Sequence, residues 1–242
     1  MIFISPPFGN YLNLTNAISI KGSFTLHERP NKWYYILKTL RYSFKHKGWV
    51  NKIGLRNPGI DWAINKYRNT NDIISIAIME EKEVDLFLNK IPSTMNLELN
   101  VSCPNVGKHL IDDKLYKFLN DERKWCIIKL SPLTTMDKID SYYNDGFRQF
   151  HCSNTLPTKE IDCKYEGGLS GKKLVPYTSK LVKNIKEKYP DTVVIAGGGI
   201  DSIEMIQYYH SMGADHYSVS SLLFSPIKFM LFYSKLNSSF KE

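Results

Sequence analysis

The sequence lacks a long hydrophobic run and any regular cysteine spacing. No apolar stretch reaches the roughly 20 residues of a membrane-spanning helix. The first residues, MIFISPPFGNYLNL, lack the basic start and apolar core of a signal peptide. The four cysteines show no CxxC spacing, which argues against a disulfide framework. We therefore expect a cytoplasmic protein with reduced thiols, no membrane partner and no bound metal.

The composition is that of a soluble globular protein. Hydrophobic residues make up 43% and charged residues 23% of the 242 residues, which is typical of one α/β domain spanning residues 1–242. The net charge of +8 suggests nucleic acid as a partner, because a basic face attracts phosphate. The lysines are scattered, however, as in KHKGWVNK, GKKL and KNIKEKY, and this favours a solvated surface over a nucleic-acid site.

Short apolar, β-branched runs alternate with longer amphipathic stretches. This alternation predicts repeated βα units around a parallel sheet, and eight strands predict a (β/α)8 TIM barrel. The expected strands are Ile2 to Ile4, Ala17 to Lys21, Ile73 to Ile78, Leu97 to Ser102, Cys126 to Ser131, Gln149 to Asn154, Thr192 to Gly197 and His216 to Ser221. Apolar spacing of three and four residues predicts helices at Glu80 to Leu88, Tyr177 to Lys188 and Ser202 to Met212.

Loop-forming residues gather directly after several of these strands, in SCPNVG, LSP, SNTLP and AGGG. A barrel carries its active-site loops at this end of the strands, so the clustering indicates a functional site there. The long segment from Thr25 to Asp72 is expected to be an insertion that folds over the mouth of the barrel. We find no internal repeat.

The strongest chemical signal is LELNVSCPN, residues 97–105, where a strand runs into a turn that carries a thiol between two carboxamides. Asn100 and Asn105 offer donors and acceptors that suit the edge of a pyrimidine-like ring. Cys103 is a candidate base, since a thiol with a pKa near ~8.5 can accept a proton where its surroundings favour thiolate. The alternative is a small buried hydrophobe flanked by turn-forming asparagines.

A lysine interrupts the apolar strand CIIKLSP. An unpaired ammonium at this position would be costly, so Lys129 needs an anionic or polar partner. The alternative is a lysine whose head group reaches solvent from the strand end. Further along, AGGG and SVSS follow the last two strands, where barrels bind phosphate through backbone N–H groups. Single glycine clusters also serve ordinary turns.

Taken together in chain order, these motifs resemble the dihydroorotate dehydrogenase family. NVSCPN resembles its catalytic loop, NKIGLRNPG its substrate loop, and SNTL the loop whose Asn binds substrate. The resemblance implies Cys103 as catalytic base. It implies substrate contacts from Asn51, Gly54, Leu55, Asn100, Asn105, Asn154 and Thr155. It implies contacts to an FMN cofactor from Lys21, Lys129, Gly168, Ser170, Gly171, Gly198, Gly199, Ser220 and Ser221.

The chain departs from the family pattern in three places. Ile4-Ser5-Pro6, followed by Pro7, stands where relatives have a small Ala-Ser-Gly turn, and each proline removes an N–H donor. Leu133 replaces an Asn that often follows the Ser-Pro pair. The chain is also shorter than typical relatives, and we expect the shortening at the N-terminus and after Asn105 and Asn154.

The resemblance implies FMN-dependent oxidation of dihydroorotate to orotate in pyrimidine biosynthesis. A cysteine base resembles the soluble class of the family. The motifs GLRNPG, KLSP and GGLSG resemble its NAD-linked subclass. The expected partners are dihydroorotate and either a second copy of the chain or an electron-transfer subunit. Two alternatives stay open: a tRNA-dihydrouridine synthase-like flavoenzyme, and a degenerate FMN barrel that binds without turnover.

Overall fold

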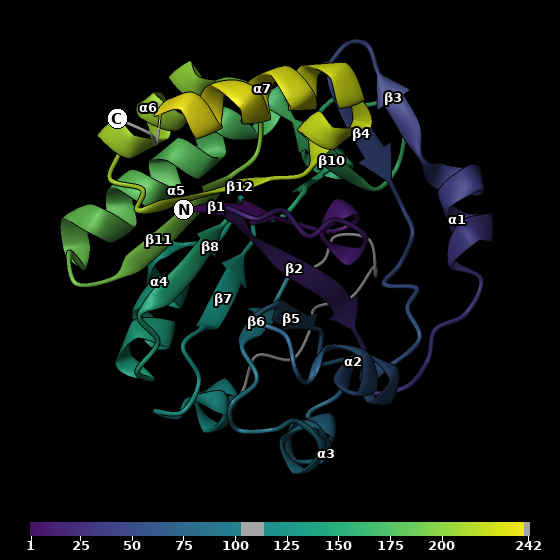
Figure 1. The fold of residues 1–242 in the computed structure, drawn as a ribbon, viewed down its shortest axis with the longest axis vertical. Coiled ribbons are helices and arrows are strands. Elements are labelled where there is room, and N and C mark those ends of the chain that lie inside the picture. The colour runs from purple at the N-terminus through teal and green to yellow at the C-terminus, as the bar shows by residue number, and fades with distance from the viewer. Residues whose placement is uncertain (103–113, 240–242) are drawn as a thin grey trace.

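The computed structural model describes residues 1–102 and 114–239, which include a closed barrel of eight parallel strands (Figure 1). Every neighbouring pair is parallel, and Ile4 of β1 lies opposite Val219 of β12 where the barrel closes. All eight predicted strands are present, so the predicted TIM barrel is confirmed. The barrel strands are β1 (Ile2–Ile4), β2 (Ala17–Phe24), β5 (Ile73–Ile76), β6 (Leu97–Asn100), β7 (Cys126–Leu130), β8 (Gln149–Cys152), β11 (Val193–Gly197) and β12 (His216–Val219).

Most of the helices in the described ranges cover the outside of the barrel, and α6 and α7 lie side by side there (Figure 1). The helices are α1 (Lys32–Thr39), α2 (Ile60–Tyr67), α3 (Glu83–Lys90), α4 (Met136–Asn144), α5 (Val175–Lys188), α6 (Ile203–Ser211) and α7 (Pro226–Ser239). Three of them, α3, α5 and α6, correspond to the helices predicted from apolar spacing. No described helix combines the length and the apolar character needed to cross a membrane.

The barrel interior has two layers of different chemistry. The lower layer is apolar, with Phe3, Ile20, Ile73, Ile127 and Ile195 packed in one cluster. Because successive side chains of a strand point to opposite faces, the inward residues two positions further along form the next layer. That layer is polar and contains Ser5, Ser75, Lys129, Gly197 and Ser218, among others. The lower layer thus makes a solid floor for a polar mouth.

A second, four-stranded antiparallel sheet lies outside the barrel. Its order is β3-β4-β10-β9, from β3 (Arg41–Ser43), β4 (Gly48–Asn51), β10 (Gly168–Gly171) and β9 (Leu156–Pro157). The prediction of a single insertion from Thr25 to Asp72 is therefore only partly right. α2 packs on β2 and β5 as an ordinary barrel helix, whereas β3 pairs with β4, and β4 pairs with the distant β10.

Close backbone approach explains several glycines of this sheet. A β-carbon on Gly167 would lie 2.1 Å from the carbonyl oxygen of Asn51, and one on Gly48 would lie 2.3 Å from that of Ser170. Gly167 also has φ 141°, which disfavours other residues. Gly167 and Gly48 therefore serve strand pairing, a role that the sequence did not indicate.

Candidate active site

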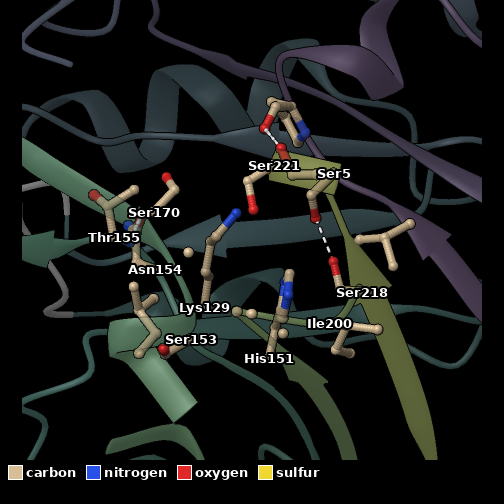
Figure 2. A pocket seen from close by; sticks show the side chains of 18 residues that line it. Ser5, Lys129, His151, Ser153, Asn154, Thr155, Ser170, Ile200, Ser218 and Ser221 are labelled. Atoms are coloured by element: carbon tan, nitrogen blue, oxygen red, sulfur yellow. Dashed lines mark hydrogen bonds between the residues drawn. The ribbon is translucent and has the colours of Figure 1, made fainter. Parts of the chain in front are cut away.

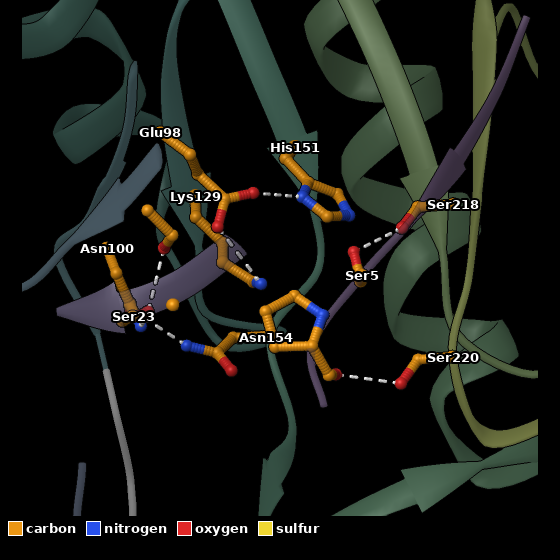
Figure 3. A network of polar contacts seen from close by, with 12 residues as sticks. Ser5, Ser23, Glu98, Asn100, Lys129, His151, Asn154, Ser218 and Ser220 are labelled. Atoms are coloured by element: carbon orange, nitrogen blue, oxygen red, sulfur yellow. Dashed lines mark hydrogen bonds and ion pairs between the residues drawn. The ribbon is translucent and has the colours of Figure 1, made fainter. Parts of the chain in front are cut away.

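Three ionisable side chains meet inside the barrel below its carboxyl-terminal mouth. Glu98 on β6, Lys129 on β7 and His151 on β8 come from neighbouring strands, and Figure 3 shows them converging. Lys129 Nζ lies 3.2 Å from Glu98 Oε1, and His151 Nδ1 lies 2.6 Å from Glu98 Oε2. All three are buried, and Glu98 is 0% exposed. Glu98 is thus the anionic partner that the sequence required for Lys129.

The protonation states of this cluster follow from burial and contact. Burial raises the pKa of Glu98, but the Lys129 charge and the hydrogen bond from His151 outweigh it, so the pKa falls to about 2. Burial and the nearby Lys129 lower the pKa of His151 by more than the Glu98 carboxylate raises it. At neutral pH Glu98 is therefore a carboxylate and His151 a neutral imidazole.

Two asparagines form the next group towards the mouth (Figure 3). Asn100 donates to Ser23 Oγ at 2.9 Å, and its carbonyl oxygen accepts from Asn154 Nδ2 at 3.0 Å. Asn154 also donates to the Ser102 carbonyl and accepts from the backbone N–H of Thr155. These two carboxamides, both predicted to hold substrate, are therefore in direct contact. The Ser23 hydroxyl holds Asn100, and backbone groups of Ser102 and Thr155 hold Asn154.

A small cavity of about 90 Å³ opens between the ends of β1, β8, β11 and β12 (Figure 2). Gly198 and Gly199 have φ values of 107° and 75°, which other residues rarely adopt. Most of the residues around this cavity are small or carry hydroxyl groups, which leaves backbone N–H groups accessible. Its lining includes Ser5, Lys129, His151, Asn154, Thr155, Ser170, Gly171, Gly198, Gly199, Ser218, Ser220 and Ser221.

A larger cavity of about 680 Å³ adjoins the small one, and both are lined by Lys129, Asn154 and Ser170. Its outer wall comes from α1 and β4, where Trp49 stacks on Phe224 with ring centroids 4.5 Å apart. The segment after β2 therefore does cover the mouth. The predicted residues in this lining are Asn51, Gly54, Leu55, Asn100, Lys129, Asn154, Thr155, Ser170, Ser220 and Ser221.

The donor groups of the two cavities fit the FMN that the family resemblance implies. The narrow cavity is lined by glycines and serines after the last two strands, which is chemistry for a phosphoryl group. The wide one is more apolar and has room for a ring system. Pro6 lines both cavities, and its carbonyl oxygen accepts from Ser220 Oγ at 2.8 Å. The Pro6-Pro7 turn thus contributes a backbone acceptor that holds the Ser220 hydroxyl beside both cavities.

Two predicted cofactor contacts lie elsewhere. Lys21 lines neither cavity; its Nζ donates to the carbonyl of Gly9 at 2.7 Å and to Asn13 at 2.6 Å, and it lies 3.6 Å from Asp72. The neighbouring Ile20 faces the barrel interior, so strand alternation turns Lys21 outward.

Gly168 also lines neither cavity, because it pairs with Asn51 and Pro157 inside the small sheet. Cys103 and Asn105 lie outside the described residues, and their roles stay predictions. The residues 1–102 and 114–239 contain no group of three or more metal-binding side chains. Among the described cysteines, Cys126, Cys152 and Cys163 are free.

Sequence reasoning missed Glu98 and His151, the two partners that surround Lys129. A signal for Glu98 was present, because alternation along Leu97–Asn100 puts Glu98 on the same face as Asn100. Ser5 and Ser218, whose hydroxyls lie 2.6 Å apart, were also missed. Serines near strand ends carry no signal of their own, since they are equally common in turns.

Comparison with known proteins points to one family. The sequence profile described as dihydroorotate dehydrogenase matches residues 13–229. The catalytic subunit of dihydroorotate dehydrogenase B (NAD(+)) from Thermotoga maritima is 27% identical over 257 residues, covering 93% of this chain and 91% of the relative. The protein of the same name from Staphylococcus carnosus is 28% identical, and the match covers 90% of this chain and 80% of the relative.

Solved structures agree at the level of the fold. The ligand-free dihydroorotate dehydrogenase of Eimeria tenella superimposes with a TM-score of 0.65 at 14% identity, covering 92% of this chain and 78% of that one. A second structure of that enzyme, in complex with ferulenol, gives a TM-score of 0.62 and covers 86% of this chain and 70% of that one. The profile match confirms the resemblance carried by the motifs and the expectation of an oxidoreductase. The chain belongs to the dihydroorotate dehydrogenase family.

Proposed function

We propose that this protein is a cytoplasmic, FMN-dependent enzyme that oxidises dihydroorotate to orotate in pyrimidine biosynthesis, as one domain spanning residues 1–242. The observation that carries the proposal is the position of Lys129. Its side chain lies where a narrow cavity lined by glycine and serine meets a wide cavity lined by Asn51, Asn100 and Asn154. This is the arrangement needed to hold a phosphate-bearing ring cofactor beside a polar planar substrate.

The residues that would hold FMN are those shared by motif and cavity: Lys129, Ser170, Gly171, Gly198, Gly199, Ser220 and Ser221. When bound, FMN would supply the hydride acceptor. Lys129 contributes a positive charge whose strength is set by Glu98, because the carboxylate 3.2 Å away partly neutralises it. Lys21 and Gly168 are not included in this set.

The substrate would bind in the wide cavity. Asn51, Asn100, Asn154 and Thr155 supply amide and hydroxyl groups, and Gly54 and Leu55 shape the substrate loop. Gly54 and Leu55 both have positive φ, at 75° and 56°, and Asn57 stabilises this loop by donating to the Leu55 carbonyl at 2.7 Å. Cys103 would take the C5 proton of dihydroorotate, and Asn105 would contact the ring, as the motif predicts.

Electron transfer onward would use a separate subunit. The relatives from Thermotoga maritima and Staphylococcus carnosus are named as catalytic subunits of an NAD-linked enzyme, which implies a second component in those proteins. We propose the same arrangement for this chain, with a homodimer as the alternative assembly.

The test is a flavin spectrum of the purified protein, recorded anaerobically before and after dihydroorotate is added. We expect an FMN spectrum that bleaches with substrate, and a Cys103→Ala variant that keeps its flavin but bleaches far more slowly. FMN-loaded wild-type protein that stays yellow would reject the reaction and favour a barrel that binds without turnover. Strong, salt-sensitive binding of tRNA would favour the dihydrouridine synthase alternative.

A further inference from the structure

The imidazole of His151 has no role in the mechanism above, yet it is buried, oriented and next to the cavity. It is 2% exposed, and its Nδ1 lies 2.6 Å from Glu98 Oε2. A carboxylate can only accept a hydrogen bond, so the neutral ring must carry its proton on Nδ1. Nε2 is therefore left with a lone pair and acts as an acceptor.

The ring nitrogen Nε2 lies on the side of Gly197, which lines the small cavity together with His151. No hydrogen bond joins it to another residue in the part of the chain that the structure describes. A β-carbon on Gly197 would lie 3.1 Å from Nε2, tighter than ordinary contact, so the glycine on the neighbouring strand leaves room for the ring. Figure 2 shows the imidazole between Lys129 and the Ser5–Ser218 pair, in the wall of the small cavity.

The order of the strands determines which part of a bound ligand lies against Nε2 of His151. β8 stands between β7, which carries Lys129 towards the wide cavity, and β11, which leads into Gly198 and Gly199. A ligand with its ring near Lys129 and its phosphate near Gly199 must pass His151 in between. The groups there are uncharged hydrogen-bonding groups: Nε2 and the hydroxyls of Ser5 and Ser218. Such a lining suits a chain of hydroxyl groups better than an aromatic ring or a second anion.

We propose that Glu98 and His151 act as a pair that presents Nε2 as a fixed acceptor for a hydroxyl of the cofactor's polyol chain, between its ring and its phosphate. Glu98 is the positioning residue because it holds the proton on Nδ1. His151 is the residue that contacts the ligand. This inference rests on the proposed function, since it takes FMN as the ligand.

The first measurement uses the protein without flavin. The ¹⁵N chemical shifts of His151, assigned by their loss in His151→Asn, should show a protonated Nδ1 and a bare Nε2 at neutral pH. In Glu98→Gln the new amide can donate to Nδ1, so the proton should move to Nε2. A wild-type ring protonated on Nε2 would overturn the proposal.

The second measurement compares ligands that differ only in the parts at issue: FMN, riboflavin, and lumiflavin, which has the ring without the polyol chain. His151→Phe should raise the Kd of FMN and of riboflavin roughly three- to tenfold, as expected for one lost hydrogen bond, and leave that of lumiflavin unchanged. His151→Asn should do the same, because its shorter amide still donates to Glu98 but withdraws from the cavity. This second variant serves if the first fails to fold.

The matched control is His216→Phe. His216 is a half-buried histidine at the opposite end of the barrel, beside Phe3 and Trp125. Its replacement should leave the Kd values of FMN, riboflavin and lumiflavin unchanged. An unchanged FMN affinity in both His151 variants, or an equal loss for lumiflavin, would overturn this inference alone. A wild-type protein that binds no FMN would instead overturn the proposed function and this inference with it.

Discussion

Two buried lysines on barrel strands have opposite surroundings. Lys21 on β2 faces outward, where a carbonyl, an asparagine and Asp72 satisfy it away from both cavities. Lys129 on β7 faces inward, with Glu98 as its partner and a cavity beside it. Both are less than a tenth exposed, at 2% and 8%. Burial of a lysine is therefore not enough to mark a functional site; the face of the strand decides it.

The largest expected effect comes from breaking the inner pair. Lys129→Met leaves the fully buried Glu98 carboxylate without its cation, and should lower the free energy of unfolding by about 3 to 5 kcal/mol in urea titrations. The double variant Glu98→Leu with Lys129→Met removes both charges and should recover most of that loss. If the double variant were as unstable as the single one, the ion pair would not be the cause.

Replacing Lys21, the outward-facing lysine, should have a smaller effect, and only on stability. Lys21→Met removes two hydrogen bonds and leaves the Gly9 carbonyl unsatisfied, so we expect a loss of roughly 2 kcal/mol in the free energy of unfolding. The Kd of FMN should not change in Lys21→Met. In the double variant Glu98→Leu with Lys129→Met, by contrast, FMN should bind more weakly. A clear rise in the FMN Kd of Lys21→Met would instead support the flavin contact that the motif predicts for Lys21.

A third effect is a pH dependence of stability that belongs to the inner pair. The pKa of Glu98 is lowered to about 2, so its contribution to stability is present above the unfolded pKa near ~4.5 and is lost as pH falls from there towards 2. Urea unfolding followed across this window should show the loss in the wild type and a shallower slope in Glu98→Gln. Parallel slopes in the two proteins would contradict the assignment.

Much of the barrel could be predicted because its elements are local patterns. Runs such as Cys126–Leu130 and Val193–Gly197 are apolar and β-branched, and a strand buried on both faces requires this wherever it occurs. The small outer sheet could not be predicted, because β4 pairs with β10, more than a hundred residues away. The glycines that allow this pairing are equally typical of ordinary turns.

The site divides in the same way. The sequence determined which residue types stand at strand ends: the asparagines, the glycines after β11, the serines after β12 and a lysine that needed an anion. The tertiary structure decided which of them meet. Alternation turned Lys21 out and Lys129 in, pairing of neighbouring strands brought Glu98 and His151 to that lysine, and folding of the segment after β2 closed the cavity. Which groups share a cavity depends on side-chain direction and strand register, and these are fixed only when the sheet closes.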